Sequence, residues 1–198
     1  MDSNKQLVPE SISKNYEIHQ WRHAIPILAS VHPPEWKDIV EVLGAFRLRH
    51  STISVGGGNK SDVSGALDGA FSARDWEEKK FETAIVLDGV ATPSPTHKID
   101  CYKSKVALEI EWNNKDPFFD RDLNNFRLLF ELRAIDVGVI VTRCDELQSL
   151  FAKLGRGASY GMSTTHMSKL LPKVEGGGAG GCPVVVFGIR SSLYDPNS

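Results

Sequence analysis

The chain has 198 residues, of which 41% are hydrophobic and 24% are charged, and its formal net charge is −2 at pH 7. This length suits one domain with a substantial core, and the composition is typical of a soluble globular protein. The net charge argues against a protein that coats nucleic acid indiscriminately. It leaves a site-specific enzyme open, because acidic and basic patches cancel in the sum. We therefore predict a single domain over residues 1–198.

The three cysteines, Cys101, Cys144 and Cys182, are widely spaced and form no Cys-x-x-Cys pair. This spacing favours reduced thiols in a cytoplasmic protein over a disulfide framework. No apolar run approaches the ~20 residues of a membrane span. The N-terminus has no basic region followed by an apolar core, so the sequence predicts no signal peptide and no membrane contact.

The N-terminal half is predicted to contain two helices and a short strand. Residues 1–15 are polar and are predicted to be flexible. A helix is expected to start at Pro33, with an apolar stripe made by Trp36, Ile39, Val40, Leu43 and Phe46. After it, Arg47 and Arg49 either stabilise the helix end or contact DNA phosphate. Asp62 can cap the second helix, over residues 63–73, and residues 83–87 are typical of a strand, followed by a turn-rich connection over 91–96.

Two glycine-rich segments are predicted to be flexible loops. The run over residues 56–60 lacks the Gly-x4-Gly-Lys-(Ser/Thr) spacing of a phosphate-binding loop. The run over residues 175–181 has too few side chains to build a core and is interpreted as a linker or loop.

The C-terminal half alternates strands with helices. Residues 105–112 place Val106, Leu108, Ile110 and Trp112 on one face, which predicts a half-buried strand. Asp120 can cap the next helix, and the apolar run 135–142 predicts a strand covered on both faces. Strand, helix and strand in this length indicate a βαβ crossover. Further helices are expected over 147–154 and 164–171, and a last buried strand over 183–189.

Three acidic residues are predicted to converge at the 105–112 strand. Glu109 and Glu111 share a face, roughly 7 Å apart, and a bend at Lys103-Ser104 would bring Asp100 beside Glu109. Converging carboxylates repel one another unless a cation neutralises them. Oxygen ligands with few protein donors favour Mg²⁺. The alternative is a solvated strand face, since Asp and Glu are mostly exposed.

The motif Asp-x8-Glu-x-Glu, followed by Trp112 and Asn114, resembles the core of the PD-(D/E)XK nucleases. It is most similar to the restriction endonucleases of the BglII, BstYI and BamHI group. Most of the superfamily has Lys at the last motif position, whereas Glu111 matches the BamHI variant. The similarity is clear over residues 100–142, weaker through 159–160 and 183–189, and faint before residue 75.

The resemblance implies an α/β fold with a PD-(D/E)XK core, in which helices flank a central mixed β-sheet, and a type II restriction endonuclease that needs Mg²⁺. It implies that Asp100 and Glu109 ligate the metal together with the backbone carbonyl of Ile110. Glu111 would bind or orient the attacking water or ligate a second metal, which leaves one or two ions open. Glu78, two residues after a Trp, becomes a weak candidate for a fourth catalytic acid, with a surface charge cluster as the alternative.

The resemblance also implies which residues read DNA. Asn113, Asn114 and Asp116 follow the catalytic strand, where the group carries polar residues that touch bases. Ser159 and Tyr160 correspond in order to a second recognition segment. The alternative for the asparagines is that they are turn formers.

The partners follow from the same resemblance. A homodimer would match the two-fold symmetry of a palindrome in double-stranded DNA. A six-base site with a GATC-like centre, a four-base 5′ overhang and a cognate DNA methyltransferase are expected by analogy. Two other functions stay open: a nuclease for repair or junction resolution, and a DNA-binding protein whose carboxylates are surface charge.

Overall fold

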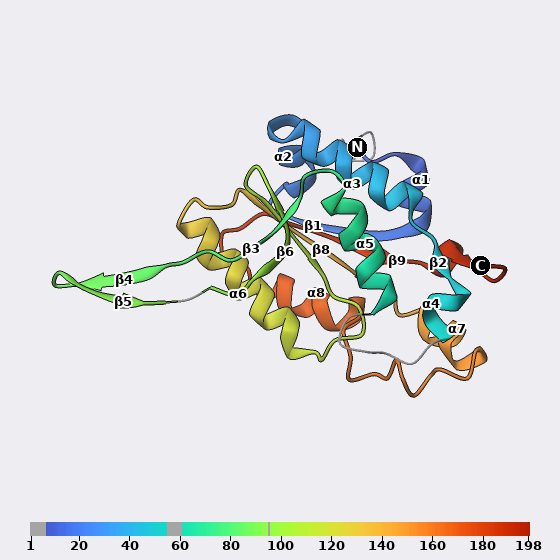
Figure 1. Cartoon of the computed structure of the whole chain (residues 1–198). Coiled ribbons are helices and arrows are strands. Elements are labelled where there is room, and N and C mark those ends of the chain that lie inside the picture. Colours follow the sequence, from blue (N-terminus) through green and yellow to red (C-terminus); the bar gives the residue numbers. More distant parts are fainter. Residues whose placement is uncertain (1–6, 55–60, 95) are drawn as a thin grey trace.

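The computed structural model describes residues 7–54, 61–94 and 96–198, and its centre is a mixed sheet of six strands (Figure 1). The strands run in the order β1, β9, β8, β7, β6, β3. Their bounds are β1 Tyr16–Trp21, β3 Glu77–Lys79, β6 Ile99–Lys103, β7 Val106–Ile110, β8 Val137–Arg143 and β9 Val184–Ile189. Strands β7, β8 and β9 are parallel, and β1, β6 and β3 are antiparallel to their neighbours. The predicted α/β fold with a central mixed sheet is confirmed.

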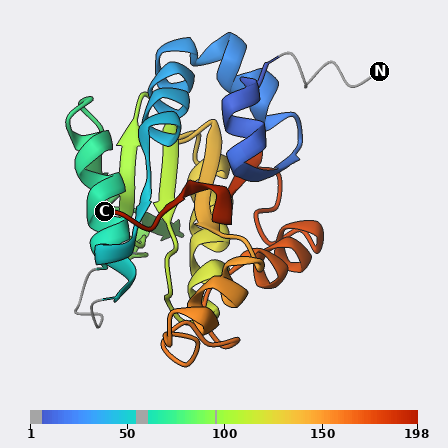
Figure 2. The same cartoon turned by 90° about the vertical axis from the view of Figure 1, so that its right-hand side faces the viewer.

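Helices cover both faces of this sheet (Figures 1 and 2). One face carries α1 (Glu10–Asn15), α2 (Ala24–Val31), α3 (Pro33–Ala45), α5 (Asp62–Ser72) and α7 (Leu147–Lys153). The other carries α6 (Pro117–Glu131) and α8 (Met167–Glu175). The remaining elements are α4 (His50–Ser54), a 3₁₀ turn at Ser191–Leu193, and a small parallel pair of β2 (Leu48–Arg49) with β10 (Tyr194–Asp195). Among the helices of the described ranges, none is long and apolar enough to cross a membrane.

Strand β7 is buried on both faces, which corrects the prediction of a half-buried strand. Leu108 packs into the core beneath α3 and α5, while Ala107 packs into the core beneath α6 and α8. The predicted alternation of faces is present, but α6 covers the second face as it crosses from β7 to β8. As a result, Glu109 and Glu111 are each only 1% exposed, and the solvated-face alternative is wrong.

The packing of α6 on the sheet depends on one glycine. A Cβ atom on Gly138 of β8 would lie 2.4 Å from the ring of Phe126, closer than any real contact. The absent side chain therefore lets α6 approach the sheet closely. This approach brings the acidic residues of α6 and β7 together.

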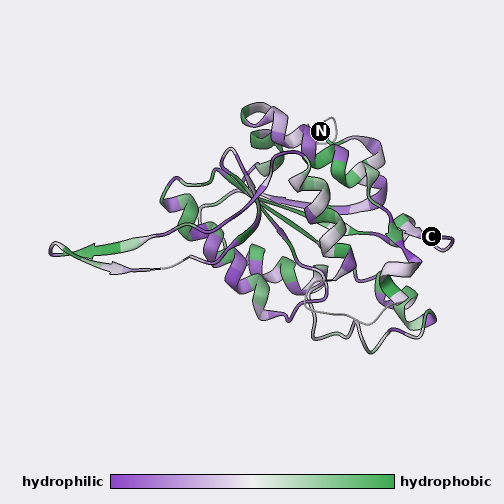
Figure 3. Ribbon diagram, in the orientation of Figure 1, coloured by the Kyte–Doolittle hydropathy of each residue, from purple (hydrophilic) through white to green (hydrophobic). Residues whose placement is uncertain are grey.

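The hairpin of β4 (Ala84–Leu87) and β5 (Val90–Pro93) projects away from the body (Figure 1). Strand β4 was expected, but its partner β5 lies where the sequence predicts a turn-rich connection. Ile85, Val86, Leu87 and Val90 are 63 to 72% exposed, so an apolar arm faces solvent (Figure 3). Large exposed apolar patches of this kind mark interaction surfaces.

Several element boundaries differ from the predictions. Residues 10–15, expected to be flexible, form α1 because Ile12 is buried against the core. The cap of α5 is Ser61, whose hydroxyl accepts from the Ser64 N–H, rather than Asp62. Helix α6 starts at Pro117, before Asp120. Residues 176–181 form consecutive turns in which Ala179 is buried, and the predicted loop over 56–60 lies outside the described residues.

Candidate active site

The β6–β7 hairpin positions the acidic motif. Ser104 and Lys105 at its turn both have positive φ, 44° and 69°, as a type I′ turn requires. Lys103 is thereby paired with Val106, and Cys101 with Leu108. The turn lies one residue beyond the bend predicted at Lys103-Ser104, and it places Asp100 beside Glu109 as expected.

Asp100 and Glu109 are each held by a backbone N–H of the opposite strand. The N–H of Asp100 donates to Glu109 Oε2 at 3.2 Å, and the N–H of Ile110 donates to Asp100 Oδ2 at 2.9 Å. In a strand, the N–H and C=O of one residue point to the same side. The carbonyl of Ile110 therefore leaves β7 on the side of Asp100.

Glu111 follows β7 and is held at both its backbone and its carboxylate. Its N–H donates to the Val141 carbonyl at 2.9 Å, and its carbonyl accepts from the Thr142 hydroxyl at 2.9 Å. Its carboxylate accepts from Asn114 Nδ2 at 2.7 Å and from Arg121 Nη2 at 3.4 Å. The side chain is therefore fixed beside the other two acids.

Asp122 of α6 is a fourth buried acid, which the sequence analysis did not assign. It is fully buried, and its Oδ1 accepts from Arg121 Nε and Nη2 at 2.9 and 2.8 Å. The available signal was helical spacing, because Asp122 lies on the inward stripe with Phe119 and Phe126. An acid at such a position is rarely tolerated without a partner.

The pKa values of these acids are raised. For Glu109, burial is the largest cause, and the charges of Asp122 and Asp100 add to it. Burial and the neighbouring Asp122 raise the pKa of Glu111 to about 9, against the opposing hydrogen bond from Asn114. Burial raises the pKa of Asp122, opposed in part by Arg121. The cluster thus contains more carboxyl groups than its surroundings can keep ionised, and a bound cation would favour their charged forms.

Two carboxylate oxygens of the cluster, Glu109 Oε1 and Asp122 Oδ2, are buried and receive no hydrogen bond from any donor in the described part of the chain. Such orphaned acceptors fit a bound cation. Within the described part of the chain, no three His, Cys, Asp or Glu side chains are arranged to hold a metal ion on their own. Mg²⁺ uses one or two carboxylates and keeps several waters, so Asp100 and Glu109 with a backbone carbonyl fit that ion.

Glu78 lies on β3, the strand next to Asp100, at the level of residues 99–102. Its side chain is 54% exposed and forms an ion pair with Lys98. This pair fits the surface-cluster alternative, and Glu78 remains a weak candidate for a catalytic role.

The two predicted recognition segments lie side by side. Asn113 has a positive φ of 61° and donates from Nδ2 to the Ser159 carbonyl at 3.0 Å. The isolated bridge between Lys115 and Thr164 extends the contact. Asp116 precedes α6 and lies 3.7 Å from Lys173. Residues about 50 positions apart in the sequence therefore form one surface next to Glu111.

Tyr160 lies in the core rather than on this surface. It is 6% exposed and stacks on Phe151 with ring centroids 4.0 Å apart. The ring supports the loop from beneath and is not placed to touch a base. The backbone carbonyl of Ser159 accepts a hydrogen bond from Asn113, so Ser159 lies beside the other segment and stays a predicted recognition residue.

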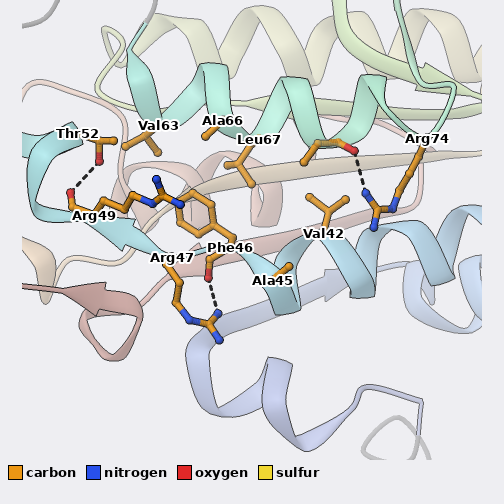
Figure 4. Close-up of a pocket in the computed structure, with 11 residues that line it drawn as sticks. Val42, Ala45, Phe46, Arg47, Arg49, Thr52, Val63, Ala66, Leu67 and Arg74 are labelled. Carbon is orange, nitrogen blue, oxygen red and sulfur yellow. Dashed lines mark hydrogen bonds between the residues drawn. The ribbon is translucent and has the colours of Figure 1, made fainter. Parts of the chain in front are cut away.

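A cavity of about 330 Å³ lies between α3 and α5 (Figure 4), and none of the acids described above lines it. Arg47, Arg49 and Arg74 line it over an apolar floor, but their guanidinium groups point in different directions. Arg47 donates to the carbonyls of Gly44 and Phe46 at 2.9 and 2.6 Å. These bonds support the helix-end role expected for Arg47.

The mixed sheet with helices on both faces, together with the buried acids on its central hairpin, defines an α/β enzyme of the nuclease type. The chain matches the family model of the restriction endonuclease BglII/BglIII over residues 16–189, which span the sheet from β1 to β9. It belongs to this family and is a type II site-specific deoxyribonuclease. A comparison with curated proteins finds no match.

Proposed function

We propose that this protein is a Mg²⁺-dependent, homodimeric endonuclease of the PD-(D/E)XK type that cuts double-stranded DNA at a short palindrome. The observation that carries the proposal is the pair of hydrogen bonds that orients Asp100 and Glu109, in which each carboxylate accepts from a backbone N–H of the opposite strand. Glu111 lies two residues further along the chain. A nuclease needs such a preorganised cluster of negative charge to concentrate a divalent cation.

Asp100, Glu109 and the Ile110 carbonyl would hold the metal. When bound, Mg²⁺ supplies charge neutralisation at phosphorus and a water of lowered pKa. Glu111 replaces the lysine of most of the superfamily and cannot act as a cation. Because Asn114 and Arg121 fix its carboxylate, it is suited to accept a hydrogen bond from the attacking water and orient it.

We assign DNA reading to Asn113, Asn114, Asp116 and Ser159. Asn, Asp and Ser side chains have distinct partners on the base edges of the major groove. The assignment is supported by the contact between Asn113 and Ser159 and by the bond from Asn114 to Glu111. The second bond would link the proposed reading surface directly to the Glu111 carboxylate.

We assign the homodimer contact to the β4–β5 arm. Between Thr83 and Ser94 the sole charge is Asp88, so the arm has no cation for DNA phosphates or for anionic lipid. In the described residues, β4 pairs with β5 alone, which leaves an open edge for another strand. At a two-fold axis a surface meets its own copy, and the uncharged β4 would bring no like charges together.

The target site and the cellular setting are proposed by analogy with the BglII, BstYI and BamHI group. We expect a six-base site with a GATC-like centre, a four-base 5′ overhang and a cognate DNA methyltransferase. The three buried free cysteines suit the reducing cytoplasm.

Digestion of a phage-sized DNA with Mg²⁺, followed by sequencing of the fragment ends, tests the proposal. One short palindrome at every end, and intact DNA in excess chelator, would support it. Full activity in chelator, or ends without a common sequence, would refute it.

A further inference from the structure

A single buried hydroxyl, that of Thr165, connects the recognition segment at residues 113–116 to the backbone of Glu111. Thr165 is fully buried, and its hydroxyl donates to the Glu111 carbonyl at 3.3 Å. The same oxygen accepts from the N–H of Asn114 at 3.1 Å. A threonine hydroxyl has one hydrogen to donate and lone pairs to accept, so both functions of the group are engaged.

The connection is part of a short paired unit formed by residues 113–116 and 163–165. The Thr165 N–H donates to the Asn114 carbonyl at 2.8 Å, and the Asp116 N–H donates to the Ser163 carbonyl at 3.3 Å. With the bridge between Lys115 and Thr164, these bonds make the two segments move together. Thr165 therefore gives the 163–165 half of the unit a direct contact with the Glu111 carbonyl, beside the bond from Asn114 to the Glu111 carboxylate.

Arg143 holds the second half of this unit from inside the protein. Its side chain is 1% exposed, and its Nε donates to the Thr165 carbonyl at 3.1 Å. Its Nη2 donates to Thr164 Oγ1 at 2.9 Å and to the carbonyls of Tyr160 and Gly161, both at 3.3 Å. Burial lowers the pKa of Arg143 to about 10, so the guanidinium stays charged at neutral pH.

Burying a cation destabilises the folded state unless acceptors satisfy its hydrogen-bond donors. Among the ion pairs of the described residues, Arg143 takes part in none, and the partners of its guanidinium are the oxygens named above together with Gln148 Oε1 at 3.5 Å. Their geometry is thus fixed by the need to satisfy one rigid planar group. Arg143 therefore fixes the position of Thr165, and Thr165 holds the Glu111 carbonyl together with Thr142.

We propose that Thr165 is a positioning residue that couples DNA reading to DNA cutting. The proposal rests on the proposed function of residues 113–116 and of Glu111. When the paired unit meets the correct bases, Thr165 holds the Glu111 carbonyl in the cutting arrangement. When it meets a wrong base, the displacement of the unit is passed to Glu111, and cleavage slows.

Thr165→Val tests this coupling, because valine keeps the shape and removes the hydroxyl. The expected result is a fall of about tenfold or more in the ratio of cleavage rates on the cognate site and on a site with one altered base pair, since the Asn114 N–H loses its buried partner. Thr165→Ser, which keeps the hydroxyl, is expected to restore the ratio. Melting temperatures of all variants establish that they are folded at the assay temperature.

Thr142→Val is the matched control. The Thr142 hydroxyl donates to the same Glu111 carbonyl at 2.9 Å, but its bond does not involve residues 113–116 or 163–165. It is expected to slow cleavage of both sites by the same factor and to leave the ratio unchanged. If Thr165→Val does not fold, Thr165→Ala takes its place.

An unchanged ratio in the folded Thr165 variant would overturn the inference, as would an equal collapse of the ratio in Thr142→Val. Failure of the proposed function would look different, since the unmodified protein would then give no defined fragment ends. The two failures are therefore separable in one set of digests.

Discussion

The carboxylate of Asp100 accepts the N–H of Ile110 at 2.9 Å, a bond that joins β6 to β7 through a side chain. The bond continues the β6–β7 ladder at the point where the paired residues end. The acid is therefore oriented by the sheet itself. A neutral side chain of the same shape can keep this bond, which separates the charge of Asp100 from its structural role.

Asp100→Asn is expected to abolish cleavage while the fold is retained. The amide oxygen still accepts from Ile110, but the charge that attracts the metal is lost. We expect a fall of about 10²- to 10³-fold or more in single-turnover rate, with DNA binding unchanged or tighter because repulsion of the phosphate is reduced. Rapid-quench experiments measure the cleavage rate, and gel-shift titration measures DNA binding. Near-normal turnover would refute the assignment of Asp100 to the active site.

Divalent ions are expected to separate binding from cutting. Mg²⁺ should support cleavage, and Ca²⁺ should support specific binding without turnover, since it accepts looser coordination and orders the nucleophile poorly. Either ion should raise the melting temperature, because it binds the folded state and neutralises the carboxylates. In Asp100→Asn the thermal shift should shrink, and an equal shift in both proteins would place the ion elsewhere.

Asn114→Ala is expected to weaken both reading and cutting. A lost bidentate base contact reduces discrimination by about 1 to 3 kcal/mol, roughly tenfold to more than a hundredfold, and Glu111 loses the 2.7 Å bond from the amide. Binding to non-specific DNA at fixed salt should hardly change, since it depends on phosphate contacts.

Asn113→Gly is the matched control for Asn114→Ala. Glycine keeps the positive φ of position 113 and removes a side chain that contacts Ser159 rather than Glu111. We expect the cleavage rate of bound cognate DNA to be affected less than in Asn114→Ala. Equal losses of specific and non-specific affinity in Asn114→Ala would identify it as a turn residue.

Val86→Lys is expected to convert a dimer into a monomer, because it places a charge on each copy at the open edge of the arm. Sedimentation velocity measures the change. Val31→Lys is the control, since Val31 is 62% exposed and Val86 is 66% exposed, but Val31 lies on α2. A dimer that persists in Val86→Lys would exclude the arm as the contact.

Two glycine replacements are expected to change stability in opposite directions. Gly138→Ala forces a methyl group against the Phe126 ring and should destabilise the fold by about 1 to 3 kcal/mol. Gly65→Ala in α5, where an added Cβ would meet no described atom within 4 Å beyond its own helix backbone, should stabilise it by about 0.5 to 1 kcal/mol. Urea denaturation of both variants measures the sign, and a stable Gly138→Ala would show that α6 can move away.

Local patterns allowed much of the sheet to be predicted. The alternation over 105–112, the apolar run over 135–142 and the crossover between them all follow from side-chain period and length. Burial of Glu109 did not follow, because it depends on α6 covering the second face of β7. The exposure of Val86 could not be predicted either. An apolar strand in an isolated hairpin has the same sequence pattern as an apolar strand inside a large sheet.

The site was predictable where its residues are close in sequence. Asp100, Glu109 and Glu111 come from one hairpin, and their spacing carries the family resemblance. Asp122 could have been found as an acid on an apolar stripe. Thr165 and Arg143 could not, because their importance arises from contacts across 54 and 22 residues of chain, to Glu111 and to Thr165 respectively.

The type I′ turn at Ser104 and Lys105 has a consequence for how the enzyme assembles. Asp100 and Ile110 are 10 positions apart, and a hairpin of this size closes in about 1 to 10 μs. Asn114 and Thr165 are 51 positions apart, and closing so long a loop costs more chain entropy. The cutting acids should therefore meet early in folding and the reading surface late. A lengthened connection between α7 and α8 should therefore slow the formation of the proposed reading surface and leave the pairing of Asp100 with Glu109 unaffected.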